Sequence, residues 1–300
     1  EWSDSALEAN HRQMHQIFSS LKLLDSITDD NGPMDQWLSS KGRRNFSKWY
    51  NAMNDVKIRE GVMVSHFDML SDLQWAIRRG GIGRNTLLTH MKRWGQMLYP
   101  ATPHMAEEWN LHLGENTLLA KTIIENDSEN KNDVATLAAE STLRNLLDNA
   151  RNVKGLAERH SKSPVTKLVI QTSPEWKIQL MREAIQLHSE EFDFMKNGQS
   201  FIQSHLLFQD DATRGEVMQY WRMLTIGSKK SRGRVFTLTE GEKMLVISDF
   251  DEAEYIQGAI NFISETIDVT KVSVYPAGTE DDVAGKARFA APLQPGLAYL

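Results

Sequence analysis

The sequence of 300 residues contains no cysteine. Disulfide bonds and thiolate metal sites are therefore excluded, and this absence fits a reducing compartment such as the cytoplasm. No apolar run approaches the roughly 18–20 residues that a helix needs to cross a bilayer, so we expect no membrane partner. The first residues, EWSD, are polar and do not form a signal-peptide pattern. They also lack an initiator methionine, which suggests a piece of a longer polypeptide.

The formal net charge is −6, but the charge is distributed unevenly along the chain. Residues 41–95 contain eleven Lys or Arg against four acidic residues, so this segment carries +7 and the rest carries −13. A second basic cluster, GSKKSRGR at residues 227–234, has four positive charges and no acid. Clustered basic residues are typical of nucleic-acid binding, although a solvated helix face produces similar clusters without any partner.

Apolar residues recur at helical spacing through the first 160 residues. Met63, Phe67 and Leu70 show the i, i+4, i+7 pattern of a helix that faces a core. Trp75 and Trp94 have the same spacing, so we expect them to be core anchors instead of stacking platforms for bases. Similar helical stretches cover residues 6–24, 34–53, 86–99, 106–113 and 136–158. Several helices with short connections predict an antiparallel bundle.

The pattern changes near residue 163. The β-branched run KLVIQTS predicts a strand from residue 167, and Pro174 predicts the first turn of a following helix. A second short strand is predicted at residues 272–275, with helices between the two strands. We therefore predict a mainly α protein: a helical bundle over residues 1–163 and a small α+β domain over residues 164–300. The last stretch, AGKARFAAPLQPGLAYL, is expected to be an extended tail.

Three local patterns resemble chemical motifs but are incomplete. His11 and His15 have the spacing of a zinc-binding helix, yet Arg12 stands where a metalloprotease has its glutamate. DDNG at residues 29–32 lacks carboxylates at the first and last positions of a calcium loop. GGIG at residues 80–83 completes neither glycine-rich phosphate signature. The sequence therefore predicts no catalytic residue, metal site or cofactor site in this chain.

The stretch LYPATPHMAEEWN, residues 98–110, has a structural explanation. Pro100 ends one helix because its ring and missing N–H cannot continue the hydrogen-bond ladder. Thr102 is predicted to cap the next helix, and the two glutamates favour the positive end of its dipole. An alternative interpretation is that His104 is a catalytic base positioned beside these carboxylates. A joint between two helices accounts for every residue and is the interpretation that we favour.

The same stretch also carries a family resemblance. It resembles the L-x-P-x-T-P-H-x-A-E-E-L-W signature of the helical anticodon-binding domain in class I aminoacyl-tRNA synthetases for valine, leucine, isoleucine and methionine. MDQWLSSKGRRNFSKWYNAMND resembles the D-x-W-L-L-S-R helix of that family. DLQWAIRRGG is similar to the L-x-W-Y-L-R-R-x-G segment of archaeal and eukaryotic-cytosolic leucyl-tRNA synthetases.

Two C-terminal motifs point more specifically to leucine. KLVIQTSPEWKIQLMREA resembles the strand and A-P-E-W-K helix that open the C-terminal domain of those enzymes. KARFAAPLQPGLAYL resembles their closing K-A-x-x-A-x-P-x-K-P-A-I-Y. The resemblance covers nearly the whole chain, in order. Trp109 and Asn110 replace the Leu-Trp of the signature, and Gln294 stands where lysine is common.

The resemblance implies the C-terminal portion of a leucyl-tRNA synthetase. Its bundle would pack against the body of tRNA(Leu), and its C-terminal domain would reach the long variable arm. The catalytic and editing domains of the same polypeptide would be its other partners, and the full-length enzyme would use ATP and Mg²⁺. The HIGH-like and KMSKS-like catalytic motifs do not occur in this sequence. We therefore expect a monomeric cytoplasmic module that is inactive alone.

Basic residues and the tail are the candidates for RNA contact, because phosphate contacts come from Lys and Arg. Residues 296–300, including Leu297 and Leu300, are expected to reach the tip of the variable arm through backbone groups and the terminal carboxylate. The phosphate candidates are Arg43, Arg44, Arg78, Arg79 and Arg84 in the bundle and Lys229, Lys230, Arg232 and Arg234 in the second domain.

Three alternatives stay open at this point. One is a stand-alone RNA-binding factor derived from a synthetase. The second is the same region of a valyl- or isoleucyl-type synthetase, which shares the helical-domain signature. The third is a purely structural helical interaction protein.

Overall fold

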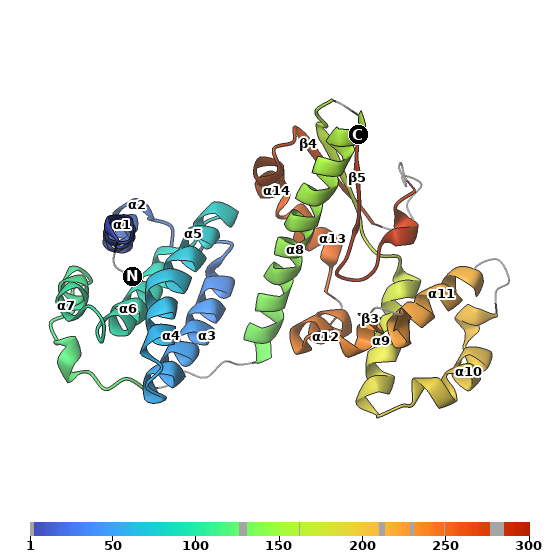
Figure 1. The fold of residues 1–300 in the computed structure, drawn as a ribbon, viewed down its shortest axis with the longest axis horizontal. Coiled ribbons are helices and arrows are strands. Elements are labelled where there is room, and N and C mark those ends of the chain that lie inside the picture. The colour runs from blue at the N-terminus through green and yellow to red at the C-terminus, as the bar shows by residue number, and fades with distance from the viewer. Residues whose placement is uncertain are drawn as a thin grey trace. The chain divides into compact units, whose positions relative to one another are not determined.

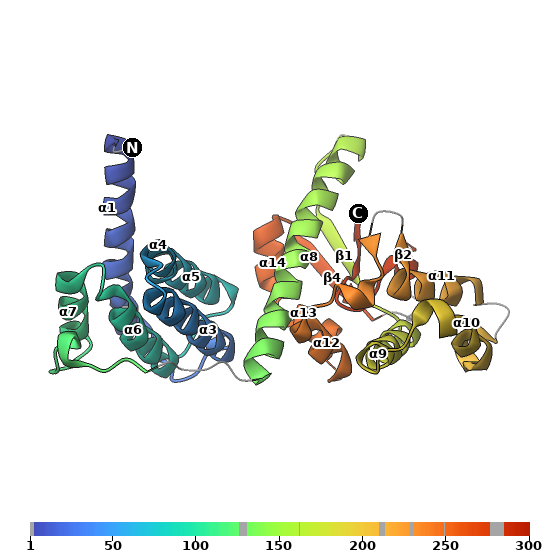
Figure 2. The same ribbon diagram turned by 60° about the horizontal axis from the view of Figure 1, so that its bottom comes forward.

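The computed structural model describes residues 3–125, 131–161, 163–209, 214–228, 231–248, 250–276 and 285–300. The chain divides into two compact units, Glu1–Leu137 and Ala138–Leu300. Helix α8 (Lys131–Ser161) contributes its first residues to the first unit and the remainder to the second. The boundary expected after residue 163 lies just beyond the end of this helix, whereas the compact units divide within it. Figures 1 and 2 show the elements of both units.

The first unit is helical, as its apolar spacing predicts. Helix α3 packs against α4, α5 and α6, and α6 in turn packs against α7. A π-helical turn, Val64–Asp68, joins α4 to α5. The bounds of the helices are Asp4–Ser19 for α1, Leu23–Ser26 for α2, Asp35–Asn54 for α3, Ile58–Met63 for α4, Met69–Arg79 for α5, Arg84–Leu98 for α6 and Pro103–His112 for α7. The predicted helical bundle is confirmed.

Two tryptophans form the centre of this core. Trp94 and Trp109 are both 0% exposed, and their rings meet edge to face with centroids 5.2 Å apart. The indole N–H of Trp94 donates to the carbonyl oxygen of Ser65 at 2.6 Å, so its buried polar group is satisfied. Gly95 leaves room for the neighbouring ring, since a Cβ there would lie 2.9 Å from Trp109 Cδ1. Trp94 is therefore a core anchor, and Trp75 packs half-buried against the same core.

The DDNG and GGIG stretches form one turn structure around Asp35. The backbone N–H groups of Gly32 and Gly83 donate to its carboxylate at 2.8 and 2.7 Å. The two loops approach so closely that a Cβ on Gly83 would lie 2.2 Å from the carbonyl oxygen of Asp30. Gly32 and Gly83 are therefore required by backbone packing, and the two stretches form turns and not binding motifs.

The second unit combines helices with a small mixed sheet of order β4-β1-β5. Strand β1 (Lys167–Gln171) pairs in parallel with β4 (Lys271–Tyr275) and antiparallel with β5 (Gly296–Tyr299). A two-stranded hairpin consists of β2 (Gly227–Ser228) and β3 (Ser231–Arg232). The helices are Glu175–Ser189 for α9, Phe194–Ser204 for α10, Arg214–Thr225 for α11, Glu240–Ile247 for α12, Glu252–Gln257 for α13 and Ile260–Ile267 for α14. The predicted α+β character is confirmed.

The end of the C-terminal stretch, Gly296–Tyr299, is a strand of this sheet and not the expected extended tail. Its four-residue strand follows two prolines, so it is too short to show the alternation that identifies strands in a sequence.

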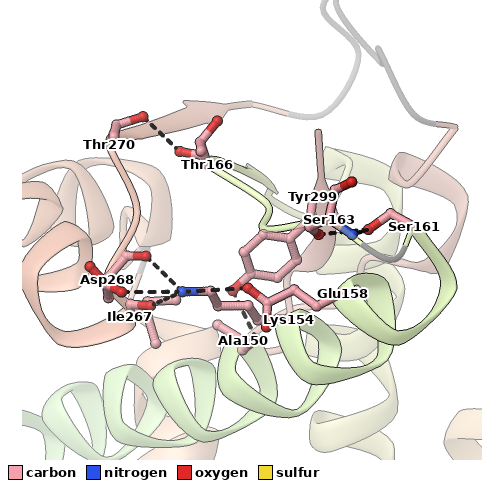
Figure 3. Close-up of polar contacts among 10 residues, drawn as sticks. All are labelled: Ala150, Lys154, Glu158, Ser161, Ser163, Thr166, Ile267, Asp268, Thr270 and Tyr299. Atoms are coloured by element: carbon pink, nitrogen blue, oxygen red, sulfur yellow. Dashed lines mark hydrogen bonds and ion pairs between the residues drawn. The ribbon is translucent and has the colours of Figure 1, made fainter.

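The C-terminal half of α8 is hydrogen-bonded to the end of α14 and to β5 in the second unit (Figure 3). The Lys154 ammonium donates to the carbonyl oxygens of Ile267 at 2.9 Å and Asp268 at 2.7 Å, at the end of α14. The Tyr299 hydroxyl, on β5, donates to the carbonyl oxygen of Ala150 at 2.8 Å. These contacts explain why most of α8 belongs to the second unit.

Candidate nucleic-acid interface

The joint around Pro103 positions α7 without forming a site for chemistry. Thr102 occupies the N-cap position, but its hydroxyl donates back to the carbonyl oxygen of Leu98 at 3.0 Å. The prediction that its side chain caps the helix is therefore wrong. Glu107 accepts the backbone N–H groups of the short turn at residues 119–121, and His104 is exposed. The helix-joint interpretation accounts for these contacts.

Arg43 is engaged inside the first unit. Its Nε donates to Asp133 Oδ2 at 2.8 Å, and its Nη2 forms a second bond to the same carboxylate. Ser40 Oγ also donates to this carboxylate, at 2.7 Å. The Asp133 side chain is only 2% exposed, so the paired bonds hold a buried charge. Arg43 therefore ties α3 to the first turn of α8.

The other predicted arginines of the first unit differ in exposure. Arg79 is buried, whereas Arg44, Arg78 and Arg84 are exposed. Arg84 also donates from Nη1 to the carbonyl oxygens of Leu24 and Ile27, at the end of α2. Arg44 on α3 and Arg78 on α5 lie on helices that pack against each other. Arg44, Arg78 and Arg84 are therefore the members of the predicted set in the first unit whose side chains reach solvent.

The basic residues of the second cluster, residues 227–234, also differ in their surroundings. Lys229 and Lys230 lie outside the described residues. Arg232, on β3, is exposed. The Arg234 guanidinium instead points inward, because its Nη2 donates to the carbonyl oxygen of Pro292 at 2.6 Å. Arg234 is therefore used within the fold and does not present its guanidinium to a phosphate backbone.

Pro292 belongs to a tight turn that leads into β5. Paired backbone hydrogen bonds of 3.0 and 2.8 Å between Ala291 and Gln294 close the turn. Leu293 has a left-handed φ of +61°, which costs a β-carbon-bearing residue on the order of 1 kcal/mol and needs support from its surroundings.

Arg234 and Glu252 supply that support from two sides of one peptide unit. Arg234 donates to the carbonyl oxygen of Pro292, and the N–H of Leu293 donates to the Glu252 carboxylate. Burial raises the pKa of Glu252 to about 7, although the Leu293 hydrogen bond and the Arg234 charge oppose this shift. Glu252 was not predicted from the sequence, where it is one of several acids at the start of a helix.

Strand β5 forms an edge of the sheet and presents backbone groups outward. Leu300 and Lys167 exchange two backbone hydrogen bonds, at 3.0 and 3.2 Å. Because antiparallel pairs alternate, the N–H and C=O groups of Leu297 and Tyr299 point away from β1. The backbone of Leu300 is used within the sheet, while its side chain is exposed. Of Leu297 and Leu300, the two tail residues singled out from the sequence, Leu297 is thus the one with outward backbone groups.

The histidine pair on α1 does not form a metal site with a third ligand in the described residues. His11 and His15 pack edge to face, with ring centroids 4.5 Å apart. Across the described ranges, no group of three or more His, Asp or Glu side chains is arranged to hold a metal ion. In the same ranges, no helix has the length and apolarity needed to span a membrane.

Residues 35–170 match the family model of the anticodon-binding domain of tRNA ligase. This match covers α3 through most of β1 and includes the Trp94–Trp109 core. The class of domain inferred from the LYPATPHMAEEWN motif is therefore confirmed.

Curated relatives extend the similarity to nearly the whole chain. The leucine–tRNA ligase of Methanococcus maripaludis strain C7 is 24% identical over 290 residues, covering 95% of this chain and 26% of that protein. Those of Methanococcoides burtonii and Methanosarcina acetivorans are each 23% identical, covering 99% of this chain and 30% of their own length. The predicted resemblance to archaeal leucine–tRNA ligases is confirmed. The chain spans between a quarter and a third of these relatives.

Proposed function

We propose that the chain is the tRNA-binding portion of a leucine–tRNA ligase. It holds the body and the long variable arm of leucine tRNA while a catalytic domain elsewhere in the polypeptide attaches leucine, using ATP and Mg²⁺. The observation that supports this most is the similarity of 95–99% of the chain to archaeal leucine–tRNA ligases. Because the chain spans 26–30% of those proteins, the catalytic and editing domains belong to the remainder in this proposal.

In the first unit, Arg44, Arg78 and Arg84 contact the phosphates of the tRNA body. Their exposure supports this role, and Arg84 contacts phosphates with the guanidinium donors that its hydrogen bonds to the end of α2 do not use. Arg43 is instead engaged with Asp133, and Arg79 is buried. Each such contact releases condensed counterions from the RNA, so binding weakens as salt increases.

In the second unit, β5 contacts the tip of the variable arm. Looped RNA exposes base edges that hydrogen-bond to protein donors and acceptors. The outward backbone groups of Leu297 and Tyr299 provide both kinds of group on a strand held by β1. Arg234 and Glu252 fix the turn before this strand, so its backbone groups are pre-positioned.

The test compares leucine tRNA with the same tRNA carrying a shortened variable arm. We expect the shortened arm to weaken binding about tenfold, which corresponds to about 1.4 kcal/mol. Unchanged affinity would exclude the role of the second unit. Failure to bind either tRNA would favour a structural interaction protein, and a coding sequence with no catalytic domain upstream in frame would favour a stand-alone factor.

A further inference from the structure

The side chain of Phe289 is large, apolar and directed toward solvent. It lies in a short 3₁₀ turn, Ala287–Phe289, and the residue is 63% exposed. Two cations lie over the ring: the Arg288 Cζ is 4.6 Å from its centroid and the Lys286 Nζ is 5.6 Å from it. An exposed aromatic ring with adjacent cations has the composition of a surface that stacks bases and contacts phosphates.

A buried ammonium holds this turn in place. The Lys177 side chain is only 3% exposed, and its Nζ donates to the carbonyl oxygens of Arg288 at 2.7 Å and Ala290 at 2.8 Å. These two residues flank Phe289, so the bonds fix the backbone on both sides of the ring. Lys177 is further stabilised by the ring faces of Trp176 and Tyr220, at 5.3 and 5.5 Å. The outward position of Phe289 is therefore set by the fold.

A cleft of about 490 Å³ opens beside the ring, between α9, α11 and the turn. Its wall contains apolar surface from Met223 and Tyr220, together with the polar side chains of Gln219 and Glu216. The apolar surfaces match the face of a base, and the amide and carboxylate groups can accept or donate hydrogen bonds at its edge. The cleft thus adds edge recognition to the stacking surface of Phe289.

We propose that Phe289 is a stacking platform for one unpaired nucleotide of the RNA held by the second unit. The base stacks on the ring and enters the cleft, while Arg288 and Lys286 contact the adjacent phosphates. The bound nucleotide belongs to a loop or bulge, because bases within a duplex do not present a free face. This inference rests on the proposed RNA-binding function, but it assigns a contact separate from the outward edge of β5.

Replacement of the ring tests the platform. We expect Phe289→Ala to weaken the binding of leucine tRNA roughly 5- to 150-fold, the range observed when base–aromatic stacking is removed. Phe289→Trp should retain tight binding, because the larger ring also stacks. Leu206→Ala is the matched control, since Leu206 is an apolar residue in the same unit that is 79% exposed. This control should bind like the unaltered chain.

Salt dependence separates stacking from charge. Phe289→Ala should leave the slope of log affinity against log salt unchanged, whereas Arg288→Gln should make it shallower by about one contact. The fluorescence of 2-aminopurine placed at one unpaired position at a time should be quenched by the unaltered chain and not by Phe289→Ala. Thermal unfolding of each variant confirms that the fold is retained.

The outcomes distinguish this inference from the function on which it rests. An unaltered chain that binds no tRNA would overturn the proposed function. If the unaltered chain binds tRNA and Phe289→Ala binds equally well, the platform is overturned while the proposed function stands. The same conclusion follows if no 2-aminopurine position responds to the ring.

Discussion

Arg234 donates a hydrogen bond from Nη2 to the carbonyl oxygen of Pro292 at 2.6 Å, across 58 residues of sequence. Arg232, two residues earlier, is exposed. The basic cluster at residues 227–234 therefore contains one arginine that stabilises the fold and one whose side chain is exposed to solvent. This difference can be measured.

Arg234→Ala should destabilise the second unit by about 2–3 kcal/mol, because the Pro292 carbonyl loses its partner and Glu252 loses a nearby positive charge. Arg232→Ala should change stability by less than about 0.5 kcal/mol. It should instead weaken tRNA binding and reduce its salt dependence. Urea unfolding of the two variants provides the comparison, and equal destabilisation would contradict the assignment.

Glu252 should give the second unit a distinctive pH dependence. Its pKa is raised from 4.5 to about 7 by burial, so the folded chain retains a proton that the unfolded chain loses. Its contribution to stability is therefore complete below pH 4.5 and is lost as the pH rises through about 7. The slope is at most about 1.4 kcal/mol per pH unit.

Glu252→Gln removes the titrating group and should flatten this part of the profile. The check is the free energy of unfolding in urea, measured between pH 4.5 and 7.5 for both proteins. If the free energy of unfolding of the unaltered chain rose over this interval relative to that of Glu252→Gln, the burial of the Glu252 carboxyl group would be contradicted.

Arg43 and Arg44 form a matched pair in the first unit. Arg43→Ala leaves the Asp133 carboxylate, 2% exposed, without its bidentate partner and should cost about 3 kcal/mol. Arg44→Ala should cost less than Arg43→Ala, because Arg44 is exposed and interactions at the surface are screened by solvent, but it should weaken tRNA binding. Unfolding and binding measured on the same two proteins test both statements. A stable Arg43→Ala protein would show that the Asp133 contact is dispensable.

The edge of β5 can be probed with proline. Leu297→Pro removes an outward N–H and should preserve the sheet, because proline is tolerated where the N–H faces away from the neighbouring strand. Ala298→Pro removes an N–H that faces Val169 on β1 and should destabilise the unit by about 3 kcal/mol or more. Only Leu297→Pro yields a folded protein suitable for binding. If that protein binds the variable arm normally, the Leu297 N–H is not a contact.

Local patterns in the sequence are sufficient for much of the fold. Helical spacing identifies the bundle, and the KLVIQTS run identifies β1, because both signals arise from neighbouring residues. The direction of a charged side chain depends on distant partners instead. Asp133 is 90 residues from Arg43, and Pro292 is 58 residues from Arg234, so no local pattern separates these arginines from exposed ones.

The exposure of Phe289 also depends on a distant residue and could not be predicted from the local sequence. The sequence KARF places Phe289 beside two cations, and this signal was available without a structure. Its exposure depends on Lys177, which is 111 residues from Arg288. Strand β5 escaped prediction because two prolines precede it and its four residues, the first of them a glycine, pair only in the folded sheet.

The central claim is that this chain binds leucine tRNA through phosphate contacts. The most direct test is the affinity for leucine tRNA measured across a series of salt concentrations, for the unaltered chain and for Arg44→Ala, Arg78→Ala and Arg232→Ala. We predict a linear fall of log affinity with log salt, made shallower by about one contact in each variant. A response that does not change with salt, or variants with the same slope as the unaltered chain, would contradict the account.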